Sequence, residues 1–175
     1  IYNAYFNSLL KGDKKNCISI IEQLLREGTD IREIYIGIFQ KSLYQVGELW
    51  EKNQVSVSTE HMATAITETL FAIIYPSLFS SLSSSKMAIV ACTVNEYHQV
   101  GGKMVADILE LNGWNTHFLG ANTPLDSLLQ HIDDFHPDVL ALSLSLYSNV
   151  PKLLETIEAV RGNNRQLDIV VGGQA

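Results

Sequence analysis

The chain has 175 residues, of which 46% are hydrophobic and 18% charged, and this length permits one large domain or two small ones. Its net charge of −7 does not favour contact with phosphate backbones, so we expect no direct nucleic-acid binding by this segment. The sequence shows no signal peptide and no apolar stretch of about 18 residues, which predicts a soluble, cytoplasmic protein without membrane contact.

The first eighty residues predict four amphipathic helices, because apolar residues recur there at three- and four-residue steps. The helices are expected over residues 1–10, 13–28, 30–50 and 56–79. Asp13 is the expected cap of the second helix and Gly28 its end, and either Thr29 or Asp30 caps the third. Helices of this number and size favour a four-helix bundle over residues 1–80.

A serine-rich segment over residues 81–86 is the predicted linker between two domains, because serine-rich segments are typically flexible. Beyond it, residues 87–175 predict a domain in which strands alternate with helices. Short apolar runs indicate strands over 87–94, 116–119, 138–145 and 167–171. Helices are expected over 100–111, 123–135 and 150–161, and Thr123 and Pro124 are expected as N-cap and first residue of the second.

This alternation predicts a parallel sheet with right-handed crossover helices. Such sheets bind ligands beyond the carboxyl ends of their strands, so the loops after the strands are the place to look for chemistry. The chain stops soon after a strand, where another helix is expected, and we therefore expect it to be part of a longer protein.

The loop after the first strand contains Glu96-Tyr97-His98-Gln99-Val100-Gly101, the strongest candidate for a binding site. A carboxylate two residues before a histidine can orient the ring and raise its basicity, as in many metal sites. The glycines Gly101 and Gly102 are expected to let a bulky group approach the backbone. From the residues alone, a loop histidine such as His98 is more often a solvated or capping side chain than a metal ligand.

The loop resembles the Asp-x-His-x-x-Gly motif of cobalamin-binding domains of the methionine synthase and methylmalonyl-coenzyme A mutase type. The resemblance covers essentially the whole chain and implies a four-helix bundle followed by a flavodoxin-like (Rossmann-like) sheet domain, an α plus α/β architecture. It implies that His98 replaces the cofactor's own base as the lower axial ligand of cobalt (base-off/His-on), and that the bundle caps the upper face of the corrin.

Further positions match this family. Ser143, in the run Leu142-Ser143-Leu144-Ser145, matches the serine of a relay with the acid and the histidine, although a strand-end hydroxyl bonded to backbone explains it equally. Gly172 and Gly173 match the glycine pair beside the buried nucleotide tail. The family's acid is usually Asp, whereas this chain has Glu96, which alters the relay geometry. Ser145 and Gly101 complete the cofactor-binding residues implied in this domain, together with Gly120 in the loop Phe118–Leu125.

The bundle narrows the resemblance. Trp50, followed after nine residues by Glu60 and His61, is similar to the Trp-x9-Glu-His pattern of light-sensing, adenosylcobalamin-dependent transcription regulators of the MerR type. In that family an apolar residue at the position of Val57 contacts the upper ligand. The resemblance implies that Trp50 covers the corrin or adenosyl group, that Glu60 bonds the ribose, and that His61 supports Glu60 or approaches cobalt. Without it, Trp50 reads as a core aromatic, and Glu60 and His61 as a solvated helix face.

One departure bears on the signal. Some photoreceptor members have a histidine directly after the tryptophan, which binds cobalt once light has removed the adenosyl group. This chain has Glu51 there, so a bis-histidine photoproduct by that route is not expected.

Two functions from different classes remain open. In the first, the chain is a non-enzymatic sensory module that binds adenosylcobalamin, assembles as a homo-oligomer and signals through a DNA-binding segment elsewhere in the protein. In the second, it is a corrinoid carrier that passes methyl groups, as methylcobalamin, between methyltransferase partners. A third reading, in which a related tetrapyrrole binds or the cobalamin has been lost, is disfavoured by His98. We expect no catalytic residues of the chain's own.

The remaining candidates are expected to be structural. Cys17 and Cys92 lie in apolar runs without a CxxC spacing and are predicted to be buried free thiols. His117, His131 and His136 are each predicted to be structural or solvated.

Overall fold

The computed structural model describes residues 1–78, 84–163 and 166–174, and the chain forms two compact units, Ile1–Ser77 and Leu78–Ala175. Residues 81–83 of the predicted linker at 81–86 lie outside the described residues. Each unit has its own core and is described separately. Within the described residues, no helix combines the length and the apolar character that crossing a bilayer requires.

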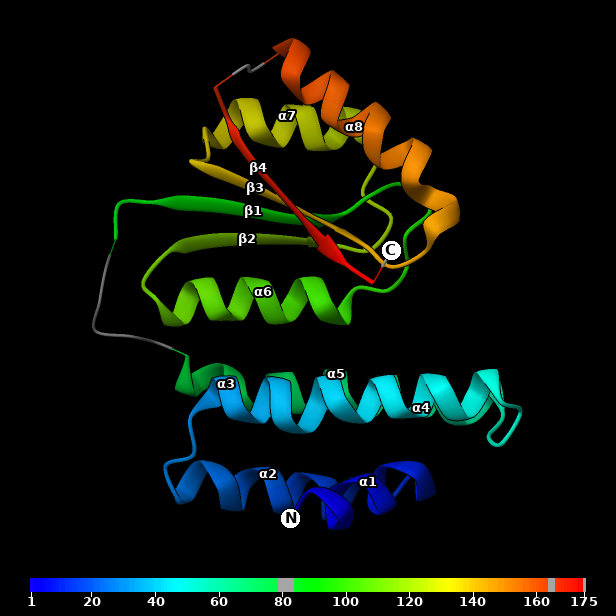
Figure 1. Ribbon diagram of the computed structural model, residues 1–175. Helices are drawn as coiled ribbons and strands as arrows, with labels where there is room; N and C mark the ends of the chain where they lie inside the picture. Colours follow the sequence, from blue (N-terminus) through cyan, green and yellow to red (C-terminus); the bar gives the residue numbers. More distant parts are fainter. Residues whose placement is uncertain (79–83, 164–165, 175) are drawn as a thin grey trace. The chain divides into compact units, whose positions relative to one another are not determined.

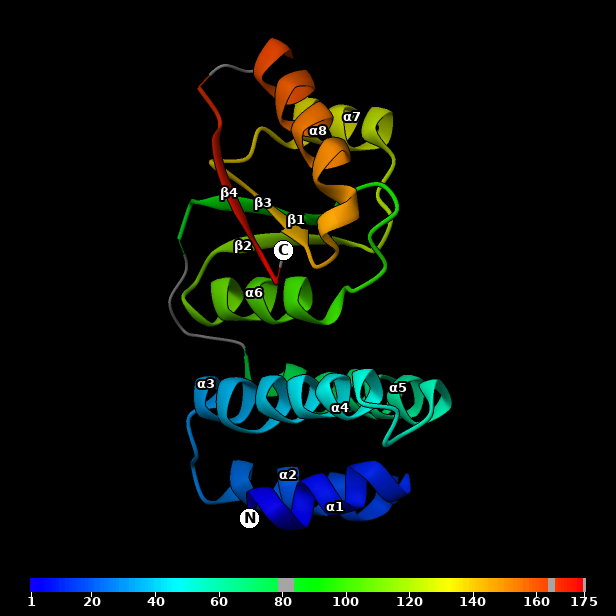
Figure 2. The ribbon, with the colours of Figure 1, turned by 45° about the vertical axis from the view of Figure 1, so that its right-hand side comes forward.

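The first unit is helical. Its elements are α1 (Tyr2–Lys11), α2 (Lys14–Arg26), α3 (Ile31–Ile34), the π-helix η1 (Tyr35–Gln40), α4 (Lys41–Glu51), α5 (Val57–Ile74) and the 3-10 turn η2 (Tyr75–Ser77). Because α3, η1 and α4 follow one another without a break, they form one long helical segment. Together with α1, α2 and α5, this segment gives two layers of helices, with α1 and α2 in one layer and α3–α4 and α5 in the other (Figures 1 and 2). This arrangement confirms the predicted helical N-terminal region.

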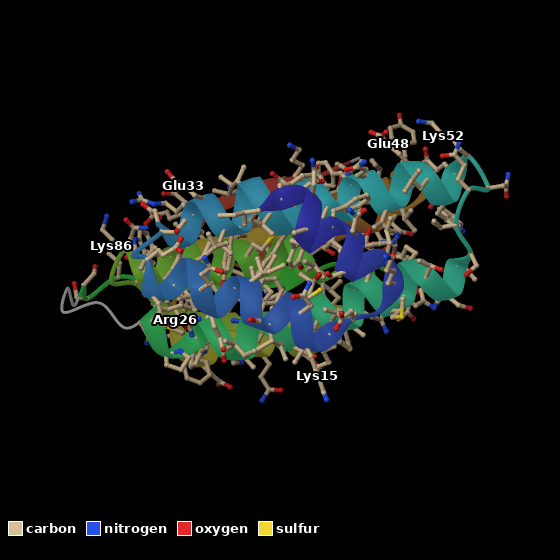
Figure 3. All side chains as sticks on the ribbon, turned by 90° about the horizontal axis from the view of Figure 1, so that it is seen from below. Lys15, Arg26, Glu33, Glu48, Lys52 and Lys86 are labelled. Atoms are coloured by element: carbon tan, nitrogen blue, oxygen red, sulfur yellow. The ribbon has the colours of Figure 1, made fainter. Side chains whose placement is uncertain are left out.

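Side-chain caps set three of the helix starts. Asp13, Asp30 and Ser56 each accept a backbone N–H from the first turn of the helix that follows, which satisfies a group that the helix itself cannot bond. Of the two caps considered for the third helix, the structure uses Asp30. In Figure 3, the charged side chains of Lys15 and Glu33 point outward from this unit, as the amphipathic pattern predicted.

An aromatic cluster forms the centre of the helical unit. Tyr35 and Phe39 lie 5.4 and 5.6 Å from Phe71 between ring centroids, with their planes steeply inclined to its plane, and Tyr5 lies 6.0 Å from Phe39. Edge-to-face contacts of this kind add to the free energy gained by burial. The π-helical stretch that holds Tyr35 and Phe39 was not predicted, because both rings also fit the ordinary helical stripe.

The second unit is a parallel α/β domain. Its elements are β1 (Met87–Cys92), α6 (Val100–Leu111), β2 (Asn115–Gly120), α7 (Leu125–Phe135), β3 (Val139–Leu144), the 3-10 turn η3 (Tyr147–Asn149), α8 (Val150–Asn163) and β4 (Asp168–Gly173). The strands are parallel in the order β2-β1-β3-β4, with α6 on one face and α7 and α8 on the other (Figure 1). The predicted parallel sheet with crossover helices is therefore confirmed.

The central strand β1 is buried along its whole length, as its continuous apolar run predicted. Its side chains alternate between two cores. Ile89 and Ala91 pack with Leu128 and Leu140 in the larger core, and Val90 belongs to a smaller core with residues of α6 and β3. This central position fixes the loop that follows β1 against both neighbouring strands.

Several predicted boundaries differ from the structure by a residue or two, and two of these differences affect the loops. Helix α7 begins at Leu125, and Pro124 is its N-cap in an extended conformation instead of its first residue. The Thr123 hydroxyl donates to the Gly120 carbonyl, 3.3 Å away, and so closes the β2–α7 loop instead of capping the helix. Strand β3 ends at Leu144, which leaves the backbone N–H of Ser145 outside the sheet ladder.

Candidate functional site

The loops after β1, β2 and β3 meet at the carboxyl end of the sheet. The strand register places Cys92 beside Ser143, and Ser143 beside Gly172, so that the chain segments following these strands start from adjacent positions. Between β1 and β2 the register shifts after Val90, and Ala91 lies opposite Gly120. Predicted site residues from four strands or their following loops are thus brought to one end of one sheet.

Glu96 and His98 form the centre of this site. The Glu96 side chain is fully buried, and its Oε1 lies 2.6 Å from His98 Nδ1 and accepts the His98 backbone N–H at 3.0 Å. Its Oε2 accepts the backbone N–H groups of Ser145 and Leu146 at 2.8 and 3.1 Å. Both carboxylate oxygens are therefore saturated by four donors from two loops.

These contacts decide the ionisation of Glu96 and the tautomer of His98. Burial by itself opposes the charged carboxylate, but the donors from His98, Ser145 and Leu146 outweigh it and hold the pKa of Glu96 below its ordinary value. A carboxylate can only accept, so the His98 proton lies on Nδ1. Nε2 is then the nitrogen with a lone pair for a metal ion, and the His98 side chain is 57% exposed.

The longer acid keeps the contact with the histidine that the resemblance implied for Asp. The other carboxylate oxygen of Glu96, Oε2, has partners that differ from the one the resemblance implied. The resemblance implied a relay through the Ser143 hydroxyl, whereas Oε2 is held by the backbone of Ser145 and Leu146. Ser143 is buried beside Cys92, whose thiol pKa is raised to about 11, first by burial and then by the charge of Glu96.

Three asparagines tie the loops together. Asn95 has a left-handed backbone (φ 66°), and its N–H donates to Asn122 Oδ1 at 2.8 Å while its carbonyl accepts from Asn149 Nδ2 at 3.0 Å. The backbone N–H of Asn122 donates to the Glu96 carbonyl at 2.8 Å. Asn122 and Asn149 were missed by the sequence reasoning, although Asn122, two residues after β2, is of a type that tolerates a left-handed backbone.

The predicted glycines divide into open and close-packed positions. A Cβ at Gly101 or Gly172 would meet nothing within 4 Å, whereas one at Gly102 would come within 3.2 Å of the Phe118 ring. The expectation that Gly102 opens the backbone to a bulky group is therefore wrong, because this glycine lets α6 pack closely on the sheet. A Cβ at Gly173 would overlap the backbone carbonyl of Leu144.

The site fits a bulky metal cofactor with a lower histidine ligand. An imidazole that is oriented through Nδ1 is a suitable donor for cobalt, and the open positions at Gly101 and Gly172 admit a group close to the backbone. The buried Thr93 hydroxyl, just beyond β1, has no hydrogen-bond partner among the described residues. A buried hydroxyl of this kind is satisfied when a polar ligand group supplies the missing bond.

In the helical unit, the residues of the predicted Trp-x9-Glu-His pattern are partly or largely exposed. Trp50, near the end of α4, is 46% exposed and Val57, at the start of α5, is 47% exposed, so Trp50 is not the core aromatic of the alternative reading. Glu60 Oε2 lies 3.6 Å from His61 Nε2, and Glu60 Oε1 accepts the Thr64 hydroxyl at 3.1 Å. Glu60 is thus held in place by neighbours on its own helix.

Near Trp50 in the sequence, Glu48 and Lys52 form an ion pair one helical turn apart, with 3.5 Å between Oε2 and Nζ (both are labelled in Figure 3). Residues two positions apart on a helix do not share a face, so this pair does not surround Trp50. A single exposed aromatic side chain is not by itself evidence of a contact surface.

His117 and His131 lie apart from the loops around His98. His117 on β2 and His131 on α7 form a pair, with 2.9 Å between Nδ1 and Nε2, and both rings pack on Phe135. Burial, followed by the proximity of His131, lowers the pKa of His117. This pairing was not predicted. Cys17 and Cys92 are buried free thiols, as predicted.

Comparison with known families gives two matches on this chain. A family described as "B12 binding domain" matches residues 86–175, and a second family with the same description matches residues 1–75. The first match contains the Glu96–His98 loop, and the second contains Trp50, Glu60 and His61.

Individual proteins similar to the chain belong to two kinds. The chain is 30% identical over 121 residues to the HTH-type transcriptional repressor CarA of Myxococcus xanthus. This alignment covers 69% of this chain and 41% of the repressor. The chain is also 21% identical over 166 residues to trimethylamine corrinoid protein 1 of Methanosarcina acetivorans, and this alignment covers 92% of this chain and 77% of that protein.

A solved structure shares the fold. The monomethylamine corrinoid protein of Methanosarcina barkeri superposes with a TM-score of 0.85 at 14% identity, over 97% of this chain and 82% of its own. At this identity the likeness shows a common architecture, and the chemistry has to be argued from the residues described above.

Proposed function

Because the chain belongs to the B12-binding domain family, we propose that it holds a cobalamin with His98 as the lower axial ligand of cobalt. The observation that carries this proposal is the contact between the buried Glu96 carboxylate and His98 Nδ1, 2.6 Å long, which leaves Nε2 as the ligating atom. Outer carboxylates of this kind orient a ligating histidine and raise its basicity. The cobalamin supplies the chemistry of its cobalt–carbon bond.

The residues of the chain have supporting roles in this proposal. Glu96 holds the His98 ring in one tautomer, and the backbone N–H groups of Ser145 and Leu146 donate to its buried carboxylate. Close approach of the cofactor to the backbone at the carboxyl ends of the strands is the role of four glycines without side chains, Gly101, Gly120, Gly172 and Gly173. Ser143 and Ser145 offer polar groups there. We assign no catalytic residue to the chain, and so propose a cofactor-binding protein that is not itself an enzyme.

For the use of the cofactor, we propose a sensory module that holds adenosylcobalamin and belongs to a longer transcription regulator. Two observations support it: the Trp50-x9-Glu60-His61 pattern with its exposed indole, and the 30% identity to a transcriptional repressor. In this proposal Trp50 and Val57 contact the upper axial group, Glu60 bonds it through its carboxylate, and His61 supports Glu60. Light or loss of the ligand would then change the assembly of a homo-oligomer, while DNA would be bound by another segment.

The second candidate is a corrinoid carrier that passes methyl groups between methyltransferase partners. The observation that favours it is coverage, since the similarity to a trimethylamine corrinoid protein extends over 92% of the chain, against 69% for the repressor. A carrier has to expose the upper side of its cofactor to each partner in turn, which makes a bulky indole at Trp50 a disadvantage.

The lower ligand is tested by reconstitution with aquocobalamin in the dark, followed by absorbance spectroscopy. The wild-type chain is expected to bind it with a spectrum of histidine-ligated cobalt. His98→Ala should lose that spectrum and about 10- to 100-fold in affinity, the usual loss for a disturbed metal site. His136→Ala, which removes another exposed histidine of the same unit, should match wild type. An unchanged spectrum in His98→Ala would refute the assignment.

The choice between sensor and carrier is tested with adenosylcobalamin and methylcobalamin in parallel. For a sensor, Trp50→Ala should weaken adenosylcobalamin about tenfold, or about 1.4 kcal/mol, and leave methylcobalamin nearly unchanged. Tyr44→Ala, which removes another exposed aromatic of the same helix, is the matched control. Affinities for both cofactors that are unchanged from wild type in Trp50→Ala, with one oligomeric state before and after illumination, would favour the carrier.

A further inference from the structure

The loop that carries Glu96 and His98 is fixed at one residue, Asn95. Its backbone is left-handed (φ 66°), a conformation that costs free energy for any residue with a side chain, although less for asparagine than for most. Both of its backbone polar groups are bonded by side chains from other loops: the N–H by Asn122 Oδ1 and the carbonyl by Asn149 Nδ2. The strained turn is thus held by partners that are distant in sequence.

Asn122 makes a second contact with the same segment. Its backbone N–H donates to the Glu96 carbonyl at 2.8 Å, and its own backbone is also left-handed (φ 49°). The Asn95 N–H and the Glu96 carbonyl are therefore both bonded by one residue of the β2–α7 loop. Gln99 extends this attachment, because its side-chain Oε1 accepts the Ala121 N–H at 3.2 Å.

The consequence lies at the carboxylate of Glu96. Its position follows from the backbone at 95–96, and from there it reaches His98 on one side and the N–H groups of Ser145 and Leu146 on the other. Release of the Asn95 turn would let a buried charged group search for new donors, at a high cost in desolvation. The four donors to Glu96 are therefore available only while the turn is held.

We propose that Asn122 is a positioning residue for the cofactor site, which acts through Asn95 and Glu96 to hold the His98 ring ready for cobalt before any cofactor binds. The proposal rests on the proposed function in naming cobalt as the target of His98. A site that is already ordered loses less conformational entropy on binding, and the ligand gains affinity by that amount. Asn149 supports the same turn from the β3–α8 side.

Two substitutions at Asn122 separate its backbone geometry from its side-chain bond. Asn122→Gly keeps the left-handed backbone and removes the Oδ1 acceptor, and Asn122→Asp keeps an acceptor at the same place. His136→Gly is the matched control, because His136 is also left-handed (φ 47°) and lies in the same unit at the end of α7.

The first measurement is amide hydrogen exchange on the unliganded chain. Asn122→Gly should speed exchange about tenfold or more at the Ser145 and Leu146 amides, which bond Glu96 and make no contact with the Asn122 side chain. Asn122→Asp should restore slow exchange, and His136→Gly should leave these amides as in wild type. Exchange that is faster only at Asn95 would overturn the proposal, because the effect would then be confined to the deleted bond.

The second measurement is a double-mutant cycle with aquocobalamin as the probe. Asn122→Gly should lower affinity about tenfold in the wild-type background and have no effect in His98→Ala, because the asparagine acts through that ring. Equal losses in both backgrounds would overturn the positioning role. If Asn122→Gly does not fold, Asn149→Ala tests the same turn in both measurements.

The two measurements keep this inference distinct from the function on which it rests. A wild-type chain that bound no aquocobalamin would refute the proposed function, while the exchange result would still decide whether Asn122 holds Glu96. A wild-type chain that bound normally, with slow exchange in Asn122→Gly, would refute the inference alone.

Discussion

The sheet unit holds histidines in two regions, and in both of them Nδ1 is bonded. At the carboxyl ends of the strands, His98 Nδ1 lies 2.6 Å from a fully buried carboxylate. On the side formed by β2 and α7, His117 Nδ1 lies 2.9 Å from the ring of His131. A carboxylate accepts only, so it fixes the tautomer of its partner, whereas a second imidazole can either donate or accept.

This difference separates a ligand site from a structural contact. Around Glu96 the donors come from two loops, and one side of the His98 ring remains exposed. Around His117 both rings pack on Phe135, so the pair joins the edge strand to its helix. The burial and saturation of the partner, more than the presence of a histidine, identify the site.

The largest expected effect lies within the first region, where Gly173 and Gly120 stand at the carboxyl ends of β4 and β2. Gly173→Ala places a Cβ onto the Leu144 carbonyl, next to the residues that hold Glu96, and should cost more than about 4 kcal/mol of unfolding free energy or prevent folding. Gly120→Ala, at the end of β2, meets only the flexible Gln99 side chain at 3.3 Å and should cost about 1 kcal/mol, from its left-handed backbone. Urea unfolding measures both, and equal losses would contradict the close approach of β3 and β4.

Removal of each histidine's partner gives an intermediate effect. Glu96→Ala leaves four donors without their buried acceptor and should destabilise the chain by about 3 kcal/mol. His131→Ala removes one hydrogen bond and a partly exposed ring contact, and should cost about 1 kcal/mol. Thermal unfolding of the unliganded variants checks the order, and a larger loss in His131→Ala would reverse the comparison.

The smallest effect concerns acid sensitivity on the β2–α7 side. Because the pKa of His117 lies below its ordinary 6.5 in the folded chain, the unfolded chain binds more protons between those two values. The unfolding free energy should therefore fall as the pH is lowered from about 6.5 through the folded pKa.

His117→Gln should remove this part of the pH dependence, and His136→Gln should keep the wild-type profile. Denaturant unfolding at several pH values between 7 and 5 provides the measurement. A profile in His117→Gln that is as steep as wild type would assign the acid sensitivity to another group.

Most of the fold was predictable because its signals are local. The apolar run at residues 87–94 and the three- and four-residue steps in the first eighty residues identify a buried strand and amphipathic helices without knowledge of their neighbours. Boundaries were less accurate at Pro124, since its conformation depends on how the β2–α7 loop closes. The π-helix at Tyr35–Gln40 left no signal, because its side chains also fit an α-helical stripe.

The candidate site was predictable in part. The spacing of Glu96 and His98 indicated a carboxylate–histidine contact. Ser143 and Gly172 were expected at strand ends, because each lies at the end of a predicted strand. The groups that complete the site are backbone N–H groups of Ser145 and Leu146 and the side chains of Asn122 and Asn149. Every residue but proline has a backbone N–H, so a partner of this kind has no signature in the amino-acid letters.

The sequence by itself determined the two-part organisation, the parallel α/β pattern and the family to which the chain belongs, because periodicity and motif spacing are properties of neighbouring residues. Only the tertiary structure decided which side chains share an environment: that Glu96 is buried between two loops, that Asn122 holds the turn before it, and that His117 pairs with His131. These contacts join residues from different strands and loops, and their geometry exists only once the sheet has formed.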